Sequence, residues 1–162
     1  MGAHSTLGVF SDAQDVSDPA ASTNTIDLAQ TSPKIGVGQH APYLCVRLND
    51  PSTTEADSLS IELQTDADDG AGAPVGTWTD VAMMFCCAAT GAEITGTDAR
   101  LATAGAWIFV GQLPYTITNR HIRLYYNNTA STEIITVDAY LSDGPPSVFR
   151  GSQTLFSNVG QP

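Results

Sequence analysis

The chain has 162 residues, enough for one domain with a substantial core, because domains of about 100 to 150 residues are the commonest. Its 6 Lys and Arg stand against 17 Asp and Glu, a formal net charge of -11, so its field repels phosphate backbones and anionic membrane surfaces. We therefore expect neither nucleic acid nor a membrane as a partner. Only 14% of the residues are charged, while Thr, Ser, Ala and Gly are abundant, which favours an all-β domain.

The first 25 residues carry scattered apolar side chains among small and acidic ones, and no helical or strand period persists. We interpret residues 1–25 as an extended N-terminal arm that is too polar to bury itself. Phe10, Asp12 and Gln14 in this arm are candidate contacts with a partner. If the arm is not part of the fold, deletion of residues 1–20 should leave the domain folded and weaken its binding to that partner.

Later segments have the pattern of half-buried strands. In residues 58–64, the residues Leu59, Ile61 and Leu63 alternate with polar residues at the two-residue period of a strand with one face on a core. Residues 120–127 alternate in the same way, with Ile122, Leu124 and Tyr126 predicted to point inward and His121 outward. The other predicted strands lie at residues 25–29, 43–48, 81–87, 106–113 and 132–141, with a weaker one at 99–103.

About eight strands is the number that two packed sheets of a jelly roll use. We therefore expect a jelly-roll-like β-sandwich over residues 26–142, followed by a C-terminal arm over residues 143–162. Val148, Phe149 and Phe156 stand in this second arm as isolated apolar anchors. The alternative for the phenylalanines of both arms is that they fold back onto the sandwich.

The segment at residues 81–87 is apolar on both strand faces, so it is either central in the fold or pressed against a neighbouring subunit. Met84 and Phe85 are therefore candidate subunit contacts, and we expect a homo-oligomer. The segment at residues 106–113 has a similar pattern, with Trp107 and Phe109 predicted on one face.

The residues that could carry chemistry do not converge. Three histidines lie far apart, and three cysteines, Cys45, Cys86 and Cys87, read as buried free thiols. The acidic run Asp66–Asp69 suggests a calcium loop, but Gly70 and Thr77 stand where an oxygen ligand and a bidentate Glu are needed, so a solvated turn is preferred. No nucleophile elbow or phosphate-binding loop occurs. We expect no enzyme, no metal and no cofactor.

Neither a targeting segment nor a membrane span is evident. No stretch approaches the roughly 18 apolar residues of a spanning helix, and the first residues lack the basic and apolar regions of a signal peptide. We expect a soluble protein that starts in the cytosol.

Three segments of the chain stand out together, in this order: residues 10–28, which begin Phe10-Ser11-Asp12-Ala13-Gln14; residues 35–48, which begin Ile35-Gly36-Val37-Gly38; and residues 113–126, which begin Leu113-Pro114. In sequence and in order they resemble segments of the capsid cement, or decoration, proteins of short-tailed bacteriophages. The resemblance implies a jelly-roll domain that clusters as homodimers or homotrimers on the outer surface of an icosahedral head. It also implies that the domain is made in the host cytoplasm, bridges major capsid proteins and has no catalytic residues.

The net charge and the two arms suit such a role. A charge of -11 keeps the free protein dispersed, and polar arms with spaced apolar anchors can fold on contact with a capsid. The rival interpretation is a carbohydrate-binding β-sandwich module of a virion or cell-surface protein. It would need aromatic side chains exposed in a row, and only Tyr125 and Tyr140 are placed for that.

Overall fold

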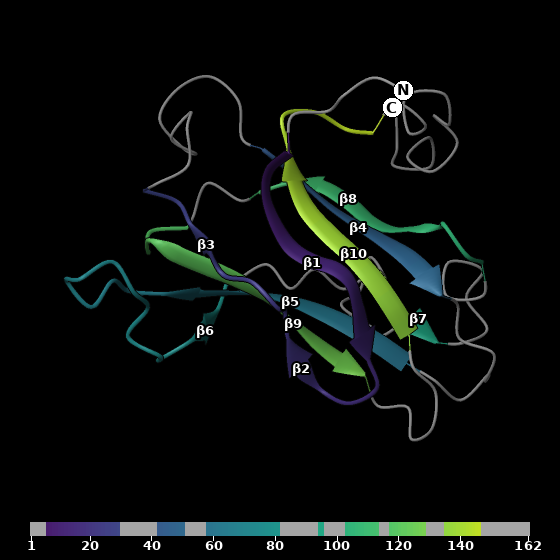
Figure 1. Cartoon of the computed structure of the whole chain (residues 1–162), viewed down its shortest axis with the longest axis horizontal. Coiled ribbons are helices and arrows are strands. Elements are labelled where there is room, and N and C mark those ends of the chain that lie inside the picture. Colours follow the sequence, from purple (N-terminus) through teal and green to yellow (C-terminus); the bar gives the residue numbers. More distant parts are fainter. Residues whose placement is uncertain are drawn as a thin grey trace, which may run out of the picture.

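The computed structural model describes residues 6–29, 42–50, 58–81, 94–95, 103–113, 117–128 and 135–146, and within these ranges the secondary structure consists of strands and turns. The strands form two antiparallel sheets (Figure 1). The first sheet has the order β1 (Thr6–Val16), β10 (Ile135–Ser142), β4 (Tyr43–Asp50) and β8 (Trp107–Gln112). The second has the order β2 (Ala20–Ala21), β9 (His121–Asn128), β5 (Ser58–Asp66) and β6 (Thr79–Asp80), with β3 (Ile26–Asp27) also beside β9 and β7 (Ile94–Thr95) beside β5.

The chain changes sheet between most consecutive strands. It passes from β1 to β2, from β3 to β4, from β4 to β5, and again from β7 to β8, from β8 to β9 and from β9 to β10. As a result β10 lies between β1 and β4, and β9 pairs with β5. This is the strand order of a jelly roll, in which two Greek keys close into a sandwich. The predicted all-β, jelly-roll-like sandwich is confirmed.

The core lies between the two sheets and follows the alternation of the strands. On β5 the three residues predicted to point inward are at most 1% exposed, and those of β9 are fully buried. Strand β10 contributes four more, because its inward residues also alternate. The inward residues of these strands are Leu59, Ile61, Leu63, Ile122, Leu124, Tyr126, Ile135, Val137, Ala139 and Leu141.

The N-terminal segment is a strand of this sandwich rather than an arm. Strand β1 pairs along its length with β10, and Phe10 and Val16 are fully buried in the core. The sequence pattern does not reveal this strand, because three register shifts interrupt its pairing between Thr6 and Gln14 and each one breaks the two-residue period. The arm predicted at residues 1–25 is therefore wrong for its described part, residues 6–25. Residues 1–5 and 147–162 lie outside the described part of the chain.

Strand β8 differs from its prediction in one respect. Its pairing with β4 shifts between Val46 and Arg47, so Phe109 packs against the core while Trp107 lies on the outer face beside Tyr140. The prediction that Trp107 and Phe109 share a face is wrong, because the bulge inserts one residue between them.

Candidate functional site

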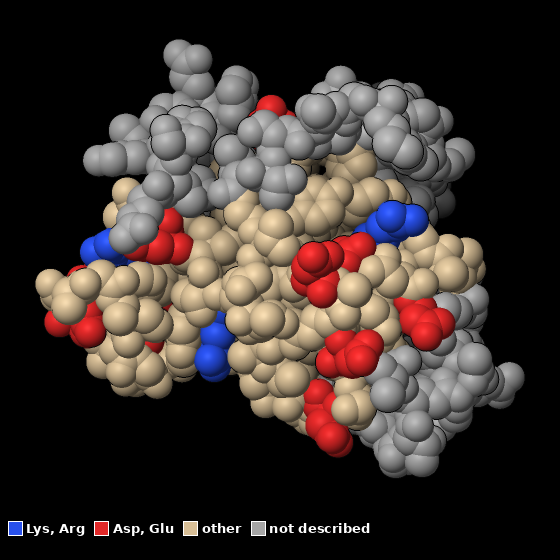
Figure 2. Space-filling model, viewed as in Figure 1, with Lys and Arg blue, Asp and Glu red and all other residues tan. Residues whose placement is uncertain are grey.

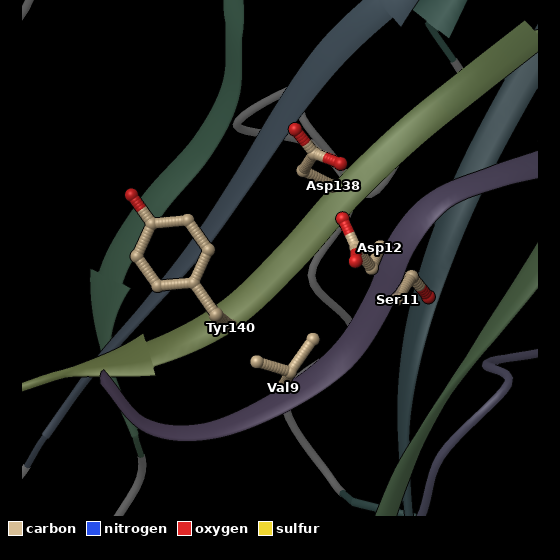
Figure 3. Close-up of a pocket in the computed structure, with 5 residues that line it drawn as sticks. All are labelled: Val9, Ser11, Asp12, Asp138 and Tyr140. Carbon is tan, nitrogen blue, oxygen red and sulfur yellow. The ribbon is translucent and has the colours of Figure 1, made fainter.

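A hollow of about 240 Å³ opens on the outer face of the first sheet, between β1 and β10 (Figure 3). It is lined by Val9, Ser11, Asp12, Asp138 and Tyr140. The irregular pairing of β1 with β10 at these residues is the structural reason for the hollow, since a bulge bends its strand and breaks the ladder locally. In Figure 3 the carboxyl groups of Asp12 and Asp138 face each other, and the ring of Tyr140 lies at one end beside Val9.

Asp138 holds the bulge in place. The backbone N–H of Ala13 donates to Asp138 Oδ1 at 2.7 Å, which replaces a hydrogen bond of the strand ladder. Ala13 has a φ of 46°, a left-handed conformation that costs an alanine about 1–2 kcal/mol. The bulge is thus a strained but anchored element that presents Asp12 to solvent.

Gln14 fixes the other side of β1. Its Oε1 accepts hydrogen bonds from Ser11 Oγ at 2.7 Å and from the backbone N–H and Oγ1 of Thr23 at 2.8 and 3.0 Å, and its Nε2 donates to the Ala21 carbonyl at 2.8 Å. A second link joins the Asn24 N–H to the Phe10 carbonyl at 2.8 Å. The segment around β2 therefore covers the outer edge of β1, which an edge strand needs to avoid unwanted pairing.

The structure separates the predicted contact residues of the N-terminal segment. Phe10 is fully buried in the core, so it is not a surface anchor. This agrees with the alternative in which the phenylalanine packs against its own sandwich. Gln14 uses its amide within the chain, and Asp12 is exposed at the hollow. The remaining predicted contacts lie outside the described residues: Met84, Phe85, Val148, Phe149 and Phe156.

The hollow belongs to a larger surface that we call the acidic aromatic face, which consists of Val9, Asp12, Asp15, Trp107, Asp138 and Tyr140. At one end, the rings of Trp107 and Tyr140 meet edge to face, with centroids 6.3 Å apart and planes at 73°. Val9 is 38% exposed beside them. At the other end Asp15 accepts a hydrogen bond from Thr136 Oγ1 at 2.9 Å. Figure 2 shows acidic side chains gathered over β1 and β10.

Sequence reasoning found only Asp12 and Tyr140 of this face. Asp138 alternates with the buried Val137 and Ala139, so its outward position was readable from the β10 pattern. Asp15 and Val9 could not be placed, because the register shifts of β1 remove the alternation that would assign them to a face.

A second polar cluster joins the start of β9 to β3 and to the loop after β5. Arg120 donates from Nε and Nη2 to the two carboxylate oxygens of Asp27, both at 2.7 Å, and its Nη1 lies 2.6 Å from Asp68 Oδ2. This hydrogen bonding lowers the pKa of Asp27 to about 2. His121, predicted to point outward, is 2% exposed, because Asp68 covers it with an oxygen 3.2 Å from Nε2.

The acidic loop is closed by its own backbone. Asp66 accepts hydrogen bonds from the N–H groups of Ala67 and Gly76, and Asp69 Oδ1 accepts from Ala71 and Ala73 at 2.7 and 3.1 Å. Among the described residues, no group of three or more His, Cys, Asp or Glu could hold a metal ion. The geometry of this loop is that of an acidic turn, as preferred from the sequence.

Two further observations concern buried chemistry and membranes. Cys45 is a buried free thiol, and burial raises its pKa to about 12, so it remains protonated at neutral pH. Cys86 and Cys87 lie outside the described residues. Within the part of the chain that is described, no helix is long and apolar enough to cross a membrane.

A protein-family model named Bbp16 matches residues 10–137. The match covers well over half of the chain and runs from β1 into β10. The chain belongs to the Bbp16 family. The Bbp16 match includes residues 10–16 of β1, in agreement with the place of this strand in the sandwich. No curated protein matches the sequence.

Proposed function

We propose that this member of the Bbp16 family is a structural virion protein, a capsid cement or decoration protein. It binds the outside of an icosahedral phage head and stabilises contacts between major capsid proteins. The three segments that resemble cement proteins of short-tailed phages lie between residues 10 and 126, within the family match at residues 10–137. The jelly roll supports the proposal as well, because it is common among capsid building blocks.

The observation that carries the proposal is the acidic aromatic face. Asp12, Asp15 and Asp138 form no ion pair with any described residue. Arg47 lies opposite Asp138 in the pairing of β10 with β4, so Asp12 and Asp15 carry the charges that are most available to a partner. Next to them, Val9 and Tyr140 offer apolar and aromatic surface of the kind that dominates binding energy at protein interfaces. The partner that fits is a capsid surface with basic side chains around an apolar pocket.

The rigidity of this face suits a cement protein. Ala13 and Asp138 fix the bulge, and Gln14 fixes the strand edge, so little conformational entropy is lost when a partner binds. A copy that contacts two capsid subunits at once stabilises their junction, because separating them then also requires breaking the contacts with the cement protein. We include in the proposal that the protein acts as a homodimer or homotrimer. Light scattering of the free protein should then give a multiple of 17.0 kDa.

The proposal is tested with heads from which the protein has been stripped. Added protein should sediment with the heads, and Asp12→Lys should weaken this binding at least tenfold, because it places a cation against a basic partner. Asp80→Lys is the matched control, since it makes the same charge change at an exposed residue of the second sheet. Failure of the unmodified protein to bind stripped heads would overturn the function. Equal binding of both variants would instead assign the contact to another surface.

A further inference from the structure

The outer face of the second sheet carries an arginine stacked on a tryptophan. The guanidinium carbon of Arg123 lies 4.2 Å from the centroid of the Trp78 ring. Arg123 Nε donates to Gln64 Oε1 at 2.8 Å, and Gln64 Nε2 donates to Asp80 Oδ1 at 3.0 Å. This chain of contacts crosses β9, β5 and β6 and ends at an exposed carboxylate.

Strand alternation adds two more side chains to this surface. Ile122, Leu124 and Tyr126 point into the core, so Arg123 and Tyr125 point outward from β9. Glu62 lies directly opposite Tyr125 in the register of β5 with β9, as Gln64 lies opposite Arg123. We call the set the second-sheet platform; it consists of Glu62, Gln64, Trp78, Asp80, Arg123 and Tyr125.

The platform has polar groups that the described chain leaves unused. Arg123 forms no ion pair with a described residue, and only its Nε has a hydrogen-bond partner there. Burial raises the pKa of Glu62, and the nearby negative charge of Asp80 raises it further. One cation beside two carboxylates disfavours an anionic ligand, whereas hydroxyl groups can accept from Arg123 and donate to the carboxylates.

We propose that the second-sheet platform binds a neutral saccharide. The apolar face of a sugar ring packs against the half-buried ring of Tyr125, next to the stacked Arg123 and Trp78, and its hydroxyl groups bond to Arg123, Asp80 and Glu62. The Gln64 hydrogen bonds hold the arginine in place before the ligand arrives. Tyr140, the other aromatic considered from the sequence, lies on the opposite sheet and does not belong to this row.

This site is independent of the proposed capsid contact. The platform lies on the outer face of the second sheet, whereas the acidic aromatic face lies on the first sheet. A copy attached to a head through its first sheet would therefore present the platform to solvent. Failure of saccharide binding leaves the head-binding result untouched, and the reverse is also true.

The experiment screens the full chain against an array of neutral and acidic oligosaccharides, followed by gel retardation with soluble dextran, galactomannan and xyloglucan. We expect binding to at least one neutral glycan, at least a tenfold loss in Tyr125→Ala and Asp80→Asn, and full binding in Tyr140→Ala. Tyr140 is the matched control because it is also a half-buried tyrosine, at an outward position of the first sheet. Circular dichroism checks that each variant is folded.

A second measurement does not depend on truncating the platform. In Trp107→Phe the chain keeps Trp78 as its single tryptophan, so a bound sugar should change the fluorescence of that ring alone. The proposal is overturned if no neutral glycan on the array binds, or if Tyr125→Ala and Tyr140→Ala lose binding equally. The proposal is also overturned if the protein binds polyglutamate or another anionic probe but no neutral glycan, because Arg123 would then bind an acidic peptide.

Discussion

At the scale of single residues, a buried hydroxyl pair joins the two sheets. Ser11 on β1 and Tyr126 on β9 meet across the core with their oxygens 2.8 Å apart. Ser11 donates its proton to Gln14 Oε1, so Tyr126 must be the donor in the shared bond. Burial raises the pKa of Tyr126, so the phenol keeps this proton at any ordinary pH.

The direction of this bond predicts unequal effects of two substitutions. Ser11→Ala leaves the buried Tyr126 hydroxyl without an acceptor and should lower the free energy of unfolding by about 2 kcal/mol. Tyr126→Phe removes the donor but leaves Ser11 bonded to Gln14, so it should cost only about 1 kcal/mol. Urea unfolding of both variants measures the difference. A larger loss in Tyr126→Phe than in Ser11→Ala would contradict the assignment of Tyr126 as the donor in this bond.

The Asp27 and Arg120 pair predicts a pH dependence. The folded pKa of Asp27 is lowered from 3.8 to about 2, so the pair stabilises the fold above pH about 4 and loses its contribution as the pH falls toward 2. Asp27→Asn should cost on the order of 1 kcal/mol at pH 7, since the side chain is 17% exposed and solvent screens it. The cost should shrink between pH 4 and 2. Asp18→Asn makes the same change at an exposed residue and serves as the matched control.

At the scale of elements, β1 decides what the N-terminal segment does. It supplies Phe10 and Val16 to the core and covers one edge of the first sheet. Removing a buried phenylalanine alone costs about 3–5 kcal/mol, a large part of the 5–15 kcal/mol by which a domain is stable. The expectation that residues 1–20 could be deleted from a folded domain is therefore withdrawn.

Two truncations test this role of β1. Deletion of residues 1–20 should abolish cooperative thermal unfolding, whereas deletion of residues 1–5, which precede the strand, should leave the transition within a few degrees of the intact chain. Calorimetry of the purified proteins measures both. A cooperative transition after the longer deletion would contradict the structural role assigned to β1.

The sequence predicted the regular strands and missed the irregular one. Leu59, Ile61 and Leu63 were assigned to the core because β5 pairs without a register shift. Strand β1 was missed because its register shifts break the same two-residue period. The bulge that forms the hollow was missed for the same reason. The Arg123 and Trp78 stack was also not predictable, since it joins β9 to the approach to β6 through tertiary structure alone.

At the scale of the whole molecule, charge and sheet order divide the surface into two faces of different chemistry. The first sheet presents aspartates beside aromatic rings, and the second presents a guanidinium among hydrogen-bonded polar side chains. A net charge of -11 adds a long-range negative field that attracts a basic partner to the first sheet. The two faces should therefore respond differently to ionic strength.

Salt titration tests that difference. Binding to stripped heads should weaken severalfold between about 50 and 500 mM NaCl, because screening shortens the reach of the acidic field. Saccharide binding by the second-sheet platform should change little, since its ligand is uncharged. Sedimentation with heads and gel retardation with the polysaccharide identified on the array measure the two responses. Head binding that is insensitive to salt would show that the aspartates do not supply the contact.

The pairing of β1 with β10 has a consequence for the order of folding. Thr6 lies opposite Ser142, so among the described strands the first one in the chain pairs with the last one. During synthesis β1, with Phe10 and Val16, cannot pair in the sheet until β10 has left the ribosome. Contacts between such distant segments slow folding and expose apolar surface in the interval. In that interval the exposed charges of Asp12 and Asp15 on β1 add like-charge repulsion, which opposes association of nascent chains before β10 arrives.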